Sequence, residues 1–596
     1  MRKQHFIPLA VFVVVAIIYS FPVIEKFSYW GQMDWDQFTF WNAVPRDTIL
    51  RYHQFPLWNP YVNGGNVVLA HPHSLFLSPF YGFVLLFGSV VGLKLEIIVH
   101  LVIGLMGLFL LARSMNLGKS SSYLASFVFM LSSMYVLHIT EGHAEWFAMA
   151  FVPWTFLFFL KSFQDKKQIL GAVIFLGLFL FAGSVDVFSV FVMFLTVYAM
   201  LKSLQIRKMI PLKMLGMIFI GTFLLCAVKL IPMIEFLAKV PRLTDENSGV
   251  SLGVLYKIFF SREQALLDID YLSTRWIYTA GLNYQWHEYG AYIGFVPLIL
   301  FLFGSIRGFK ERWPLIMTGL ICLLVALGGK SPVNLWKALH SFPVYNSLHV
   351  PSRFILGAIF SIALLSGLGL SFLERTTSTV IKNKSMRWYK WLSFVIMIFV
   401  LCDLYQVNSP IFKNAFTIRP MEVKRNESFG QRYQDINLHP KKIVDSYAYD
   451  TSHSSVYPIF LSNSGIIEGN EVVNIDRGRV RTTSEPDYRG EAYLSASKGD
   501  VTFEYFSPNK VILNVNAGDR DLLVLNQNYY EGWRVKKDRK GAKLQPYKGL
   551  IAVPVEPGDQ KVLFYYRPLS FLLGAFVTLM FLLGSSLYLI KERKNF

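Results

Sequence analysis

Long apolar runs constrain the fold of this chain more than any other feature. A membrane-spanning helix needs about 17–25 consecutive apolar residues, and twelve runs approach that length, several of them short. They cover residues 6–24, 94–112, 121–139, 145–161, 168–184, 186–201, 214–234, 290–306, 314–328, 353–373, 391–408 and 568–590. A thirteenth run at residues 79–92 is too short to span and fits an interfacial or re-entrant piece. The sequence predicts a mostly α, polytopic membrane protein with twelve transmembrane helices.

Composition and the N-terminus agree with a membrane location. Only 16% of the residues are charged, whereas soluble domains carry about 25%, so a purely cytosolic enzyme is excluded. The N-terminus is basic and leads into the run at residues 6–24, but no small-x-small cleavage site follows it. We therefore interpret this run as a retained first membrane helix.

The distribution of charge predicts the orientation. With both termini in the cytoplasm, the cytoplasmic segments contain 22 basic and four acidic residues. This excess is the positive-inside pattern of membrane proteins, and it accounts for nearly all of the net charge of +19. A nucleic-acid partner is therefore not expected. We predict a bacterial cytoplasmic (inner) membrane protein whose large loops and active site face outward.

The domain organisation follows from these spans. Residues 1–408 are predicted to form a transmembrane domain with a large first outer loop at residues 25–93. Residues 409–566 contain no spanning run and show short alternating strands at residues 510–516, 521–526 and 560–566, separated by turn signals. We predict an extracytoplasmic, β-sandwich-like domain there. Residues 567–596 supply the final transmembrane helix and a basic cytoplasmic tail.

Histidine marks the outer side as the working surface. Ten of the twelve histidines lie on or near that side: His53, His71, His73, His138, His143, His287, His340, His349, His439 and His453. Ionisable residues that gather on one side of a membrane protein indicate a functional site.

The first outer loop has the densest set of candidate residues. Asp34 and Asp36 are two residues apart and flanked by tryptophans, so either could act as a general base beside an aromatic wall. The alternatives are a helix N-cap for Asp34 and an interfacial belt for the tryptophans. Candidate sugar- or acceptor-binding residues in this loop are Trp35, Trp58, Asn59, His71 and His73.

Three shorter outer motifs accompany the loop, at residues 141–146, 286–294 and 349–354. They add the candidate sugar- or acceptor-binding residues His143, Glu145, His287, Glu288 and Tyr292. Arg353 at an outer helix N-terminus suits a phosphate, and His349 and Lys229 are candidate partners in that role. Neither HExxH nor a nucleotide-binding motif occurs. The sequence therefore predicts no metal and no cofactor besides a lipid-linked donor, while a divalent metal stays open.

Several motifs together resemble the bacterial YfhO-like membrane protein family. In the first loop they are DWDQ at residues 34–37, QFPLWNPY at 54–61, LAHPHS at 69–74 and LSP at 77–79. Later ones are EYGAYIG at 288–294, VPSRF at 350–354, NYYEGW at 528–533, VPVEPG at 553–558 and FYYRP at 564–568. The resemblance extends over nearly the whole chain in order.

This resemblance implies a GT-C-type glycosyltransferase, which moves a hexose or N-acetylhexosamine from a polyprenyl-phosphate carrier to an extracytoplasmic acceptor. It further implies a glycan acceptor such as a cell-wall or surface glycopolymer, and a catalytic acidic residue in the first outer loop. That role falls on Asp36 or Asp34, with Asp36 preferred. A single displacement would invert the anomeric centre. The expected partners are membrane lipid and, upstream, a donor-synthesising polyprenyl-phosphate glycosyltransferase and a flippase.

Two other classes of function stay open at this point. Twelve spans with both ends inside also suit a lipid-linked-sugar flippase or a secondary transporter, although no inverted halves are visible. A non-catalytic envelope scaffold could use the β domain to bind a partner. Cleavage of the sugar from its carrier distinguishes a glycosyltransferase from a flippase or transporter and from a scaffold.

Overall fold

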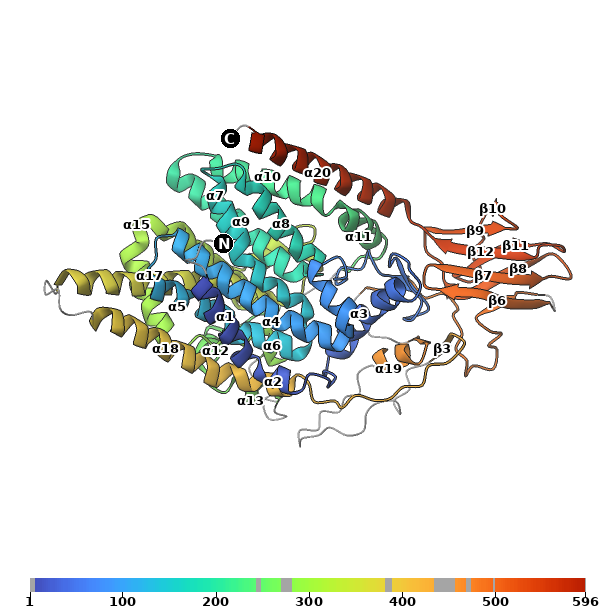
Figure 1. The fold of residues 1–596 in the computed structure, drawn as a ribbon, viewed down its shortest axis with the longest axis horizontal. Coiled ribbons are helices and arrows are strands. Elements are labelled where there is room, and N and C mark those ends of the chain that lie inside the picture. Colours follow the sequence, from blue (N-terminus) through green and yellow to red (C-terminus); the bar gives the residue numbers. More distant parts are fainter. Residues whose placement is uncertain are drawn as a thin grey trace. The chain divides into compact units, whose positions relative to one another are not determined.

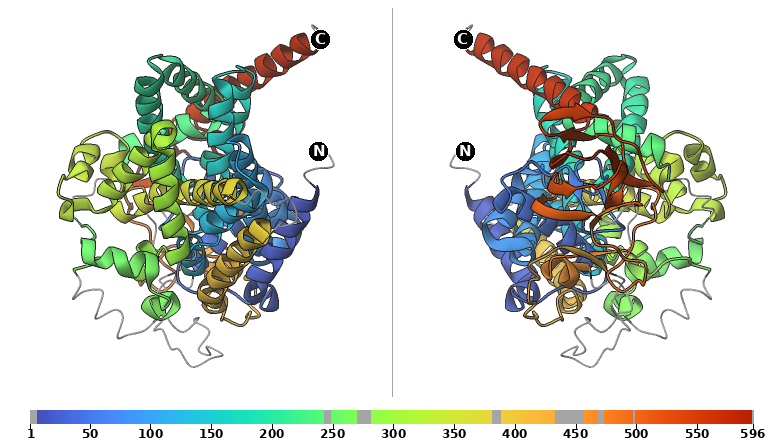
Figure 2. Two further views of the ribbon diagram at one scale, coloured as in Figure 1. Left: turned by 90° about the vertical axis from the view of Figure 1, so that its left-hand side faces the viewer. Right: turned by 90° about the vertical axis from the view of Figure 1, so that its right-hand side faces the viewer.

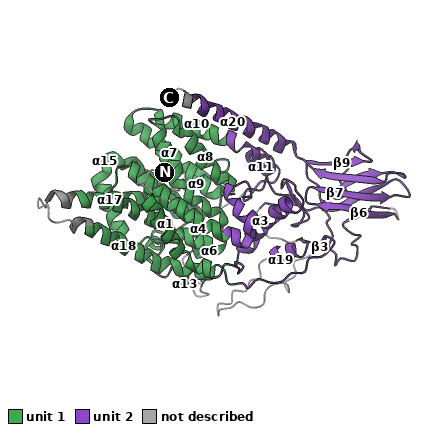
Figure 3. Ribbon diagram, viewed as in Figure 1, with its two compact units in different colours: residues 1–27, 94–223, 243–417 green, residues 28–93, 224–242, 418–596 purple. Residues whose placement is uncertain are grey.

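The computed structural model describes residues 6–242, 248–269, 281–380, 388–432, 456–467, 473–496 and 499–594. Two compact units emerge, each assembled from segments far apart in the sequence (Figure 3). Unit 1 comprises residues 1–27, 94–223 and 243–417, and unit 2 comprises residues 28–93, 224–242 and 418–596. Two of the outer histidines, His439 and His453, lie outside the described residues.

Unit 1 is helical throughout most of its described length (Figure 1). Its α-helices are α1 (Phe6–Tyr19), α2 (Phe21–Glu25), most of α4 (Gly82–Ser114), α5 (Lys119–Met130), α6 (Ser133–Glu141), α7 (Val152–Ser162), α8 (Gln168–Phe181), α9 (Val185–Ile206), α10 (Ile210–Leu225), α12 (Leu252–Phe260), α13 (Gln264–Ile269), α15 (Phe295–Ala326), α16 (Leu335–His340), α17 (Ile355–Val380) and α18 (Trp388–Asn408). Short 3-10 segments join them: η3 (Ala144–Phe151), η4 (Trp286–Glu288), η5 (Gly328–Lys330), η6 (Tyr345–Ser347), η7 (Pro351–Phe354) and η8 (Ser409–Asn414).

Seven described segments are long and apolar enough to cross a membrane, or eight if the bent pair of α10 and α11 (Ala227–Lys239) counts as one span. They are Pro79–Ser114, Lys119–Glu141, Ala144–Ser162, Val185–Ile206, Pro351–Arg375, Trp391–Asn414 and Leu569–Lys591. The chain is thus a mostly helical, multi-pass membrane protein, as predicted. The number of long spanning segments is smaller than the twelve that hydropathy predicts.

Helix breaks account for much of this difference. The run at residues 6–24 forms a 14-residue α1 followed by α2, and the run at residues 168–184 forms a 14-residue α8. The run at residues 214–234 bends by 85° where α10 meets α11. Hydropathy does not reveal such bends, because apolar residues suit both arms of a bent helix equally.

Two predicted spans between residues 290 and 328 lie within one helical element, α15. From residue 297 to residue 308 of α15, the residues of α17 that it contacts rise in number from 366 to 372. From residue 319 to residue 322 of α15, the contacted residues of α17 fall in number from 361 to 357. The two halves of α15 therefore run in opposite directions along α17.

The short run at residues 79–92 is broken at Gly88, whose backbone has φ 83° and ψ 166°. Glycine tolerates this conformation because it lacks a Cβ atom. Beyond the break, a Cβ atom on Gly92 would lie 2.5 Å from the Cα of Val84, so the two short segments pack closely. The 3-10 turn η2 (Pro79–Tyr81) and the first residues of α4 thus form a short arm before the break, and the re-entrant interpretation stays a prediction.

Unit 2 combines the first predicted outer loop with the C-terminal part of the chain. Its helices are α3 (Trp35–Leu50), α11, α19 (Val456–Leu461) and α20 (Leu569–Lys594). Its short strands are β1 (Trp58–Asn59), β2 (Asn66–Val67), β3 (Gly430–Arg432) and β4 (Ser464–Ile466). Helices α11 and α20 pack together, with Gly574 against the carbonyl of Ala227.

The C-terminal region is rich in β-strands, as predicted (Figures 1 and 2). One sheet has the strand order β10-β9-β12-β7-β6 and a second has the order β11-β8-β5. Their bounds are β5 (Ala492–Leu494), β6 (Asp500–Ser507), β7 (Lys510–Asn516), β8 (Asp521–Asn528), β9 (Trp533–Lys537), β10 (Lys540–Ala542), β11 (Leu550–Val555) and β12 (Lys561–Tyr566). The three predicted strands correspond to β7, β8 and β12. In β7 the residues Val511, Leu513 and Val515 alternate as buried positions, which is the pattern that predicted them.

The first loop contributes a β-hairpin to this domain. Strands β1 and β2 pair antiparallel, with Trp58 opposite Val67. Asn509 accepts a hydrogen bond from the backbone N–H of Trp58 at 2.9 Å, and Asn528 donates one to the carbonyl of Asn63 at 2.8 Å. Side-chain amides of the β domain thus hold the loop in place.

Candidate functional site

Three predicted outer motifs converge in unit 1 on one buried group of ionisable side chains. We name this group the histidine–arginine cluster. It comprises His138, Glu141, His143, Glu145, Asp186, His287, Glu288 and Arg353. Of the predicted site residues, the structure thus brings together His143, Glu145, His287, Glu288 and Arg353.

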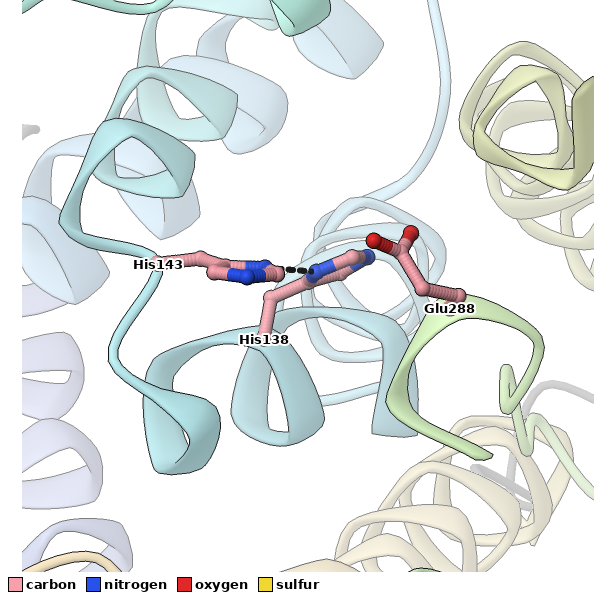
Figure 4. Close-up of side chains that lie close together, drawn as sticks. All are labelled: His138, His143 and Glu288. Carbon is pink, nitrogen blue, oxygen red and sulfur yellow. Dashed lines mark hydrogen bonds between the residues drawn. The ribbon is translucent and has the colours of Figure 1, made fainter. Parts of the chain in front are cut away.

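A reversal of the chain after α6 brings two imidazoles of the cluster into contact through their ring nitrogens. Helix α6 ends at Gly142, whose φ of 116° is the left-handed conformation of a helix C-terminus. The next residue, His143, donates its backbone N–H to the carbonyl of His138 at 3.0 Å. The Nδ1 atoms of the two rings then lie 2.9 Å apart (Figure 4). One nitrogen must donate and the other accept, so at least one ring is neutral.

A buried ion-pair network forms the other half of the cluster. The Nε atom of Arg353 donates to Glu288 Oε2 at 2.8 Å, and its Nη2 atom donates to Oε1. Its Nη1 atom lies 2.9 Å from Asp186 Oδ2. Burial alone would raise the pKa of Glu288, but the Arg353 guanidinium outweighs this effect and holds that pKa well below its usual range.

Aromatic and imidazole rings surround these charges. The ring of His138 stacks on Trp146, with centroids 3.6 Å apart and planes at 9°. His287 lies between two glutamates: its Nδ1 atom is 3.5 Å from Glu141 and its Nε2 atom is 3.8 Å from Glu288. Three imidazoles beside several carboxylates provide the chemistry to exchange protons or to hold a cation.

The structure corrects the role predicted for Arg353. Two carboxylates already match its single charge, so the guanidinium is not an open site for a donor phosphate. Two other predicted site residues of unit 1 have different neighbours. Tyr292 donates its hydroxyl to Asp403 at 2.7 Å, and the ring of His349 lies 5.8 Å from that of Tyr284.

In unit 2, helix α3 presents a second candidate site. A pocket opens beside this helix. Its lining residues are Trp41, Val44, Pro45, Asn59, Val62, Asn66, Val67, Val68, His71 and Ser74. The Trp41 ring lies 4.9 Å from His71 and stacks on His73 at 5.8 Å, centroid to centroid. We name this site the Trp41 pocket.

The two aspartates at the start of α3 differ in their surroundings. Both oxygens of Asp36 accept backbone hydrogen bonds from the first turn of α19, from Val456 at 2.8 Å and from Tyr457 at 3.1 Å. Asp34 occupies the N-cap position of α3, but its side chain makes no capping hydrogen bond there. The sequence offered a capping role for Asp34 as an alternative. In the structure it is Asp36 that accepts hydrogen bonds from the start of a helix, and that helix is α19.

Lys229 has a positioning role next to the Trp41 pocket. Its side chain, only 1% exposed, donates from Nζ to the carbonyl of Pro72 at 3.1 Å and to that of Ser74. These bonds fix the turn that carries His71 and His73. The donor-phosphate role predicted for Lys229 is corrected accordingly, because its ammonium group is directed at protein carbonyls.

Two predicted sugar-stacking residues are part of the packing instead. Trp58 is completely buried between Trp533 and Tyr566, and its indole N–H donates to Gln527 at 2.9 Å. Trp35 is 1% exposed. Neither ring has a face left for a sugar, so the prediction for both is wrong.

Sequence reasoning assigned no site role to Trp41 of the pocket or to His138, Glu141 and Asp186 of the cluster. Trp41 lies seven residues after Asp34, which places both on the same face of α3. This spacing was a usable signal. His138 was counted among the outer histidines but not assigned to the site, since its contact with His143 depends on the reversal at Gly142.

Part of the sequence is similar to a described family. Residues 489–578 match the family model described as Bacterial membrane protein YfhO. This match confirms the resemblance indicated by the motifs over strands β5 to β12 and the first part of α20. Among curated protein sequences, no match to the chain is found.

Three solved structures are similar to parts of this chain. The arabinofuranosyltransferase AftD from Mycobacteria is 13% identical, with 70% of this chain and 27% of that chain covered and a TM-score of 0.44. The oligosaccharyltransferase AglB from Archaeoglobus fulgidus, in complex with an inhibitory peptide and a dolichol-phosphate, is 12% identical, with 79% and 65% covered and a TM-score of 0.41. ArnT from Cupriavidus metallidurans, bound to undecaprenyl phosphate, is 11% identical, with 68% and 75% covered and a TM-score of 0.36. The chain thus spans about a quarter of the length of AftD and just under two thirds of that of AglB.

Proposed function

We propose that this chain is an integral-membrane glycosyltransferase. It moves a hexose or N-acetylhexosamine from a polyprenyl-phosphate carrier to an extracytoplasmic glycan, such as a cell-wall or surface glycopolymer. Support comes from the family match over residues 489–578, the motifs that resemble YfhO-like proteins, and the seven segments among the described residues that are long and apolar enough to cross a membrane. The Trp41 pocket is the structural observation that carries the proposal.

The lining of the Trp41 pocket suits a carbohydrate. An indole ring offers an apolar face for stacking on a sugar ring, and amide, imidazole and hydroxyl groups match sugar hydroxyls. Trp41, Asn59, His71 and Ser74 supply these groups along the lining of the pocket. We assign the pocket to one unit of the acceptor glycan.

We assign the general-base role to Asp34 and a positioning role to Asp36. Asp34 lies two helical turns before Trp41 on the same face of α3, so an acceptor of more than one sugar unit extends from the pocket toward it. Asp36 is held by its two bonds to α19. Asp34 would take the proton of the attacking hydroxyl, while that oxygen bonds to the anomeric carbon and polyprenyl phosphate leaves. A single displacement of this kind inverts the anomeric centre.

We assign no residue to the donor phosphate. Arg353 and Lys229, the two cations predicted for that role, are already held by carboxylates and carbonyls. The donor is expected to come from a polyprenyl-phosphate glycosyltransferase and a flippase, and the reaction takes place on the outer face of the bacterial cytoplasmic membrane.

The test is sugar transfer by the purified full-length protein in lipid vesicles, with a radiolabelled polyprenyl-phosphate sugar and a glycan acceptor. The enzyme releases free polyprenyl phosphate as label moves to the acceptor. Because a general base contributes about 10²–10⁴-fold, Asp34→Asn should lower this rate by at least about 100-fold. Transport of the intact lipid across the bilayer without cleavage would indicate a flippase, and glycan binding without either would indicate a scaffold.

A further inference from the structure

The histidine–arginine cluster contains a set of metal-ligand atoms that the proposed reaction does not use. His138, His143 and Glu288 each offer one ligand atom, and these atoms lie within 4.8 Å of one another (Figure 4). The three side chains are 0%, 7% and 4% exposed. They come from three separate places in the chain: the last turn of α6, the residue after its C-cap, and η4.

We propose that His138, His143 and Glu288 bind a first-row divalent transition-metal ion, for which zinc is the best match. Two imidazole nitrogens and one carboxylate form a known zinc ligand set that leaves a further coordination position open. A calcium or magnesium site would consist of oxygen ligands instead. The inference stands on the cluster alone and does not depend on the proposed sugar transfer.

Unsatisfied polar atoms provide an independent reason for an ion. His138 Nε2 and Glu145 Oε2 are both buried and have no hydrogen-bond partner among the described residues. A buried polar atom without a partner destabilises the folded state. The Nε2 lone pair of a neutral imidazole is a metal ligand, so coordination removes part of this destabilisation. His138 thus has one nitrogen directed at His143 and a second nitrogen available to an ion.

The surrounding groups resemble those that orient metal ligands in proteins. Arg353 binds both oxygens of Glu288 and so fixes the direction of the carboxylate. A carboxylate has about four lone-pair sites, so it can accept from arginine and still bind an ion. Trp146 stacks on His138 and fixes its ring plane. Outer partners of this kind are typical of ligated carboxylates and imidazoles.

The charge of the cluster also favours a cation. It contains four carboxylates, Glu141, Glu145, Asp186 and Glu288, and one guanidinium, that of Arg353. Buried carboxylates are costly unless they are paired with cations, protons or metal ions. A divalent cation adds two positive charges at the centre of this group.

Direct metal binding to the full-length protein tests the proposal. The protein, purified in detergent and stripped with a chelator, is titrated with cobalt(II), whose visible absorption reports the ligands that it binds. We expect a single ion per chain with imidazole ligation and displacement of the cobalt by zinc. Loss of an outer partner weakens metal sites by about 10–100-fold, so His143→Gln, which removes a direct ligand, should weaken binding by about 100-fold or more.

His100 offers a matched control. It is also fully buried in unit 1 and stacked on an aromatic ring, that of Phe147, and its Nδ1 atom bonds the carbonyl of Glu96. His100→Gln should bind cobalt as the wild type does. The thermal midpoint of each variant is measured beside its metal affinity, so that misfolding is separated from ligand loss. Absence of a cobalt spectrum in the wild type, or equal affinity in a folded His143→Gln variant, would overturn the proposal.

Discussion

Arg353 holds Glu288 through two of its N–H groups, with Nε 2.8 Å from Oε2. The pair joins η7, which directly precedes α17, to η4, and the two residues are 65 positions apart in the sequence. Both side chains are buried, so each charge depends on the other for compensation. Together with the ion pair between Arg353 and Asp186, this contact fixes the centre of the histidine–arginine cluster.

Removal of the guanidinium should therefore destabilise unit 1. Breaking a buried ion pair from one side costs about 3–5 kcal/mol, because the remaining charges lose their partner. We expect Arg353→Met to lower the thermal midpoint in detergent strongly, and Arg353→Lys, which keeps the charge but loses the two-pronged geometry, to lower it less. The exposed pair of Lys561 and Glu504 is the control, where Lys561→Met should cost less than about 1 kcal/mol. Equal midpoints for Arg353→Met and the control would contradict this account.

Asp36 should protect the first turn of α19 from hydrogen exchange. Its carboxylate accepts from the N–H groups of Val456 and Tyr457, and loss of a helix cap costs about 0.5–2 kcal/mol. Amide exchange measured by mass spectrometry should be faster at residues 456–461 in Asp36→Ala than in the wild type. Asp34→Ala is the matched control and should leave this peptide unchanged. The prediction fails if both variants exchange alike.

Trp58 should affect stability and leave sugar binding intact. The ring is fully buried and its N–H donates to Gln527, so Trp58→Ala should cost about 3–5 kcal/mol. Trp58→Phe keeps most of the packing and should cost about 1 kcal/mol for the hydrogen bond. Chemical unfolding followed by fluorescence measures both. A folded Trp58→Phe variant with a raised KM for the acceptor would restore the sugar-stacking role.

Trp41, in contrast to Trp58, should affect binding of the acceptor glycan. A stacking contact is worth about 0.5–1.5 kcal/mol, so Trp41→Ala should raise the KM for the acceptor glycan by up to about tenfold and change kcat little. Trp391, which is 67% exposed in α18, is the control, and Trp391→Ala should leave both constants unchanged. Steady-state transfer rates over a range of acceptor concentrations provide the test. An unchanged KM in Trp41→Ala would remove the pocket from the proposal.

Glu491 should make the β domain less stable as the pH rises. Burial raises the pKa of Glu491 from 4.5 to about 7, although Gln431, Tyr488 and Asn526 donate hydrogen bonds to it. Between pH 4.5 and about pH 7 the unfolded chain releases this proton while the folded chain keeps it. The free energy of unfolding therefore falls across that window, by on the order of 3 kcal/mol, and levels off above it.

Hydrogen exchange at β5 and β8 between pH 5 and pH 8, corrected for the intrinsic exchange rate, measures this effect. The Glu491→Gln variant cannot ionise and should lose most of the pH dependence, although its amide N–H group would face the amide of Asn526. A wild type that is more stable at pH 8 than at pH 5 would show that the sign is wrong.

Local patterns in the sequence predicted much of the fold. Strands β7 and β12 were found because more and less buried residues alternate along them. Strand β8 is buried at nearly every position, so the turn signal before it was the more informative pattern. Breaks such as that between α10 and α11 were not found, since both arms are equally apolar. The roles of Trp58 and Trp35 were missed for a related reason. Trp58 is buried by partners more than 450 residues away, such as Gln527, and no local pattern records that contact.

The candidate site was predicted in part. The motifs at residues 141–146, 286–294 and 349–354, which were predicted to lie on the same side of the membrane, meet in one cluster. The sequence could not show that Arg353 faces Glu288 and Asp186, because charge matching depends on side-chain placement and not on composition. The arginine therefore looked available for a phosphate when it is internally paired.

The most direct test of the central claim is the fate of a doubly labelled donor, a polyprenyl phosphate labelled in the lipid and in the sugar, presented to the purified protein with a glycan acceptor. The account predicts that the sugar label moves to the acceptor while the lipid label remains as free polyprenyl phosphate, and that Asp34→Asn abolishes this separation. If both labels stay together in every condition, although the folded protein binds the lipid, the chain is not a glycosyltransferase.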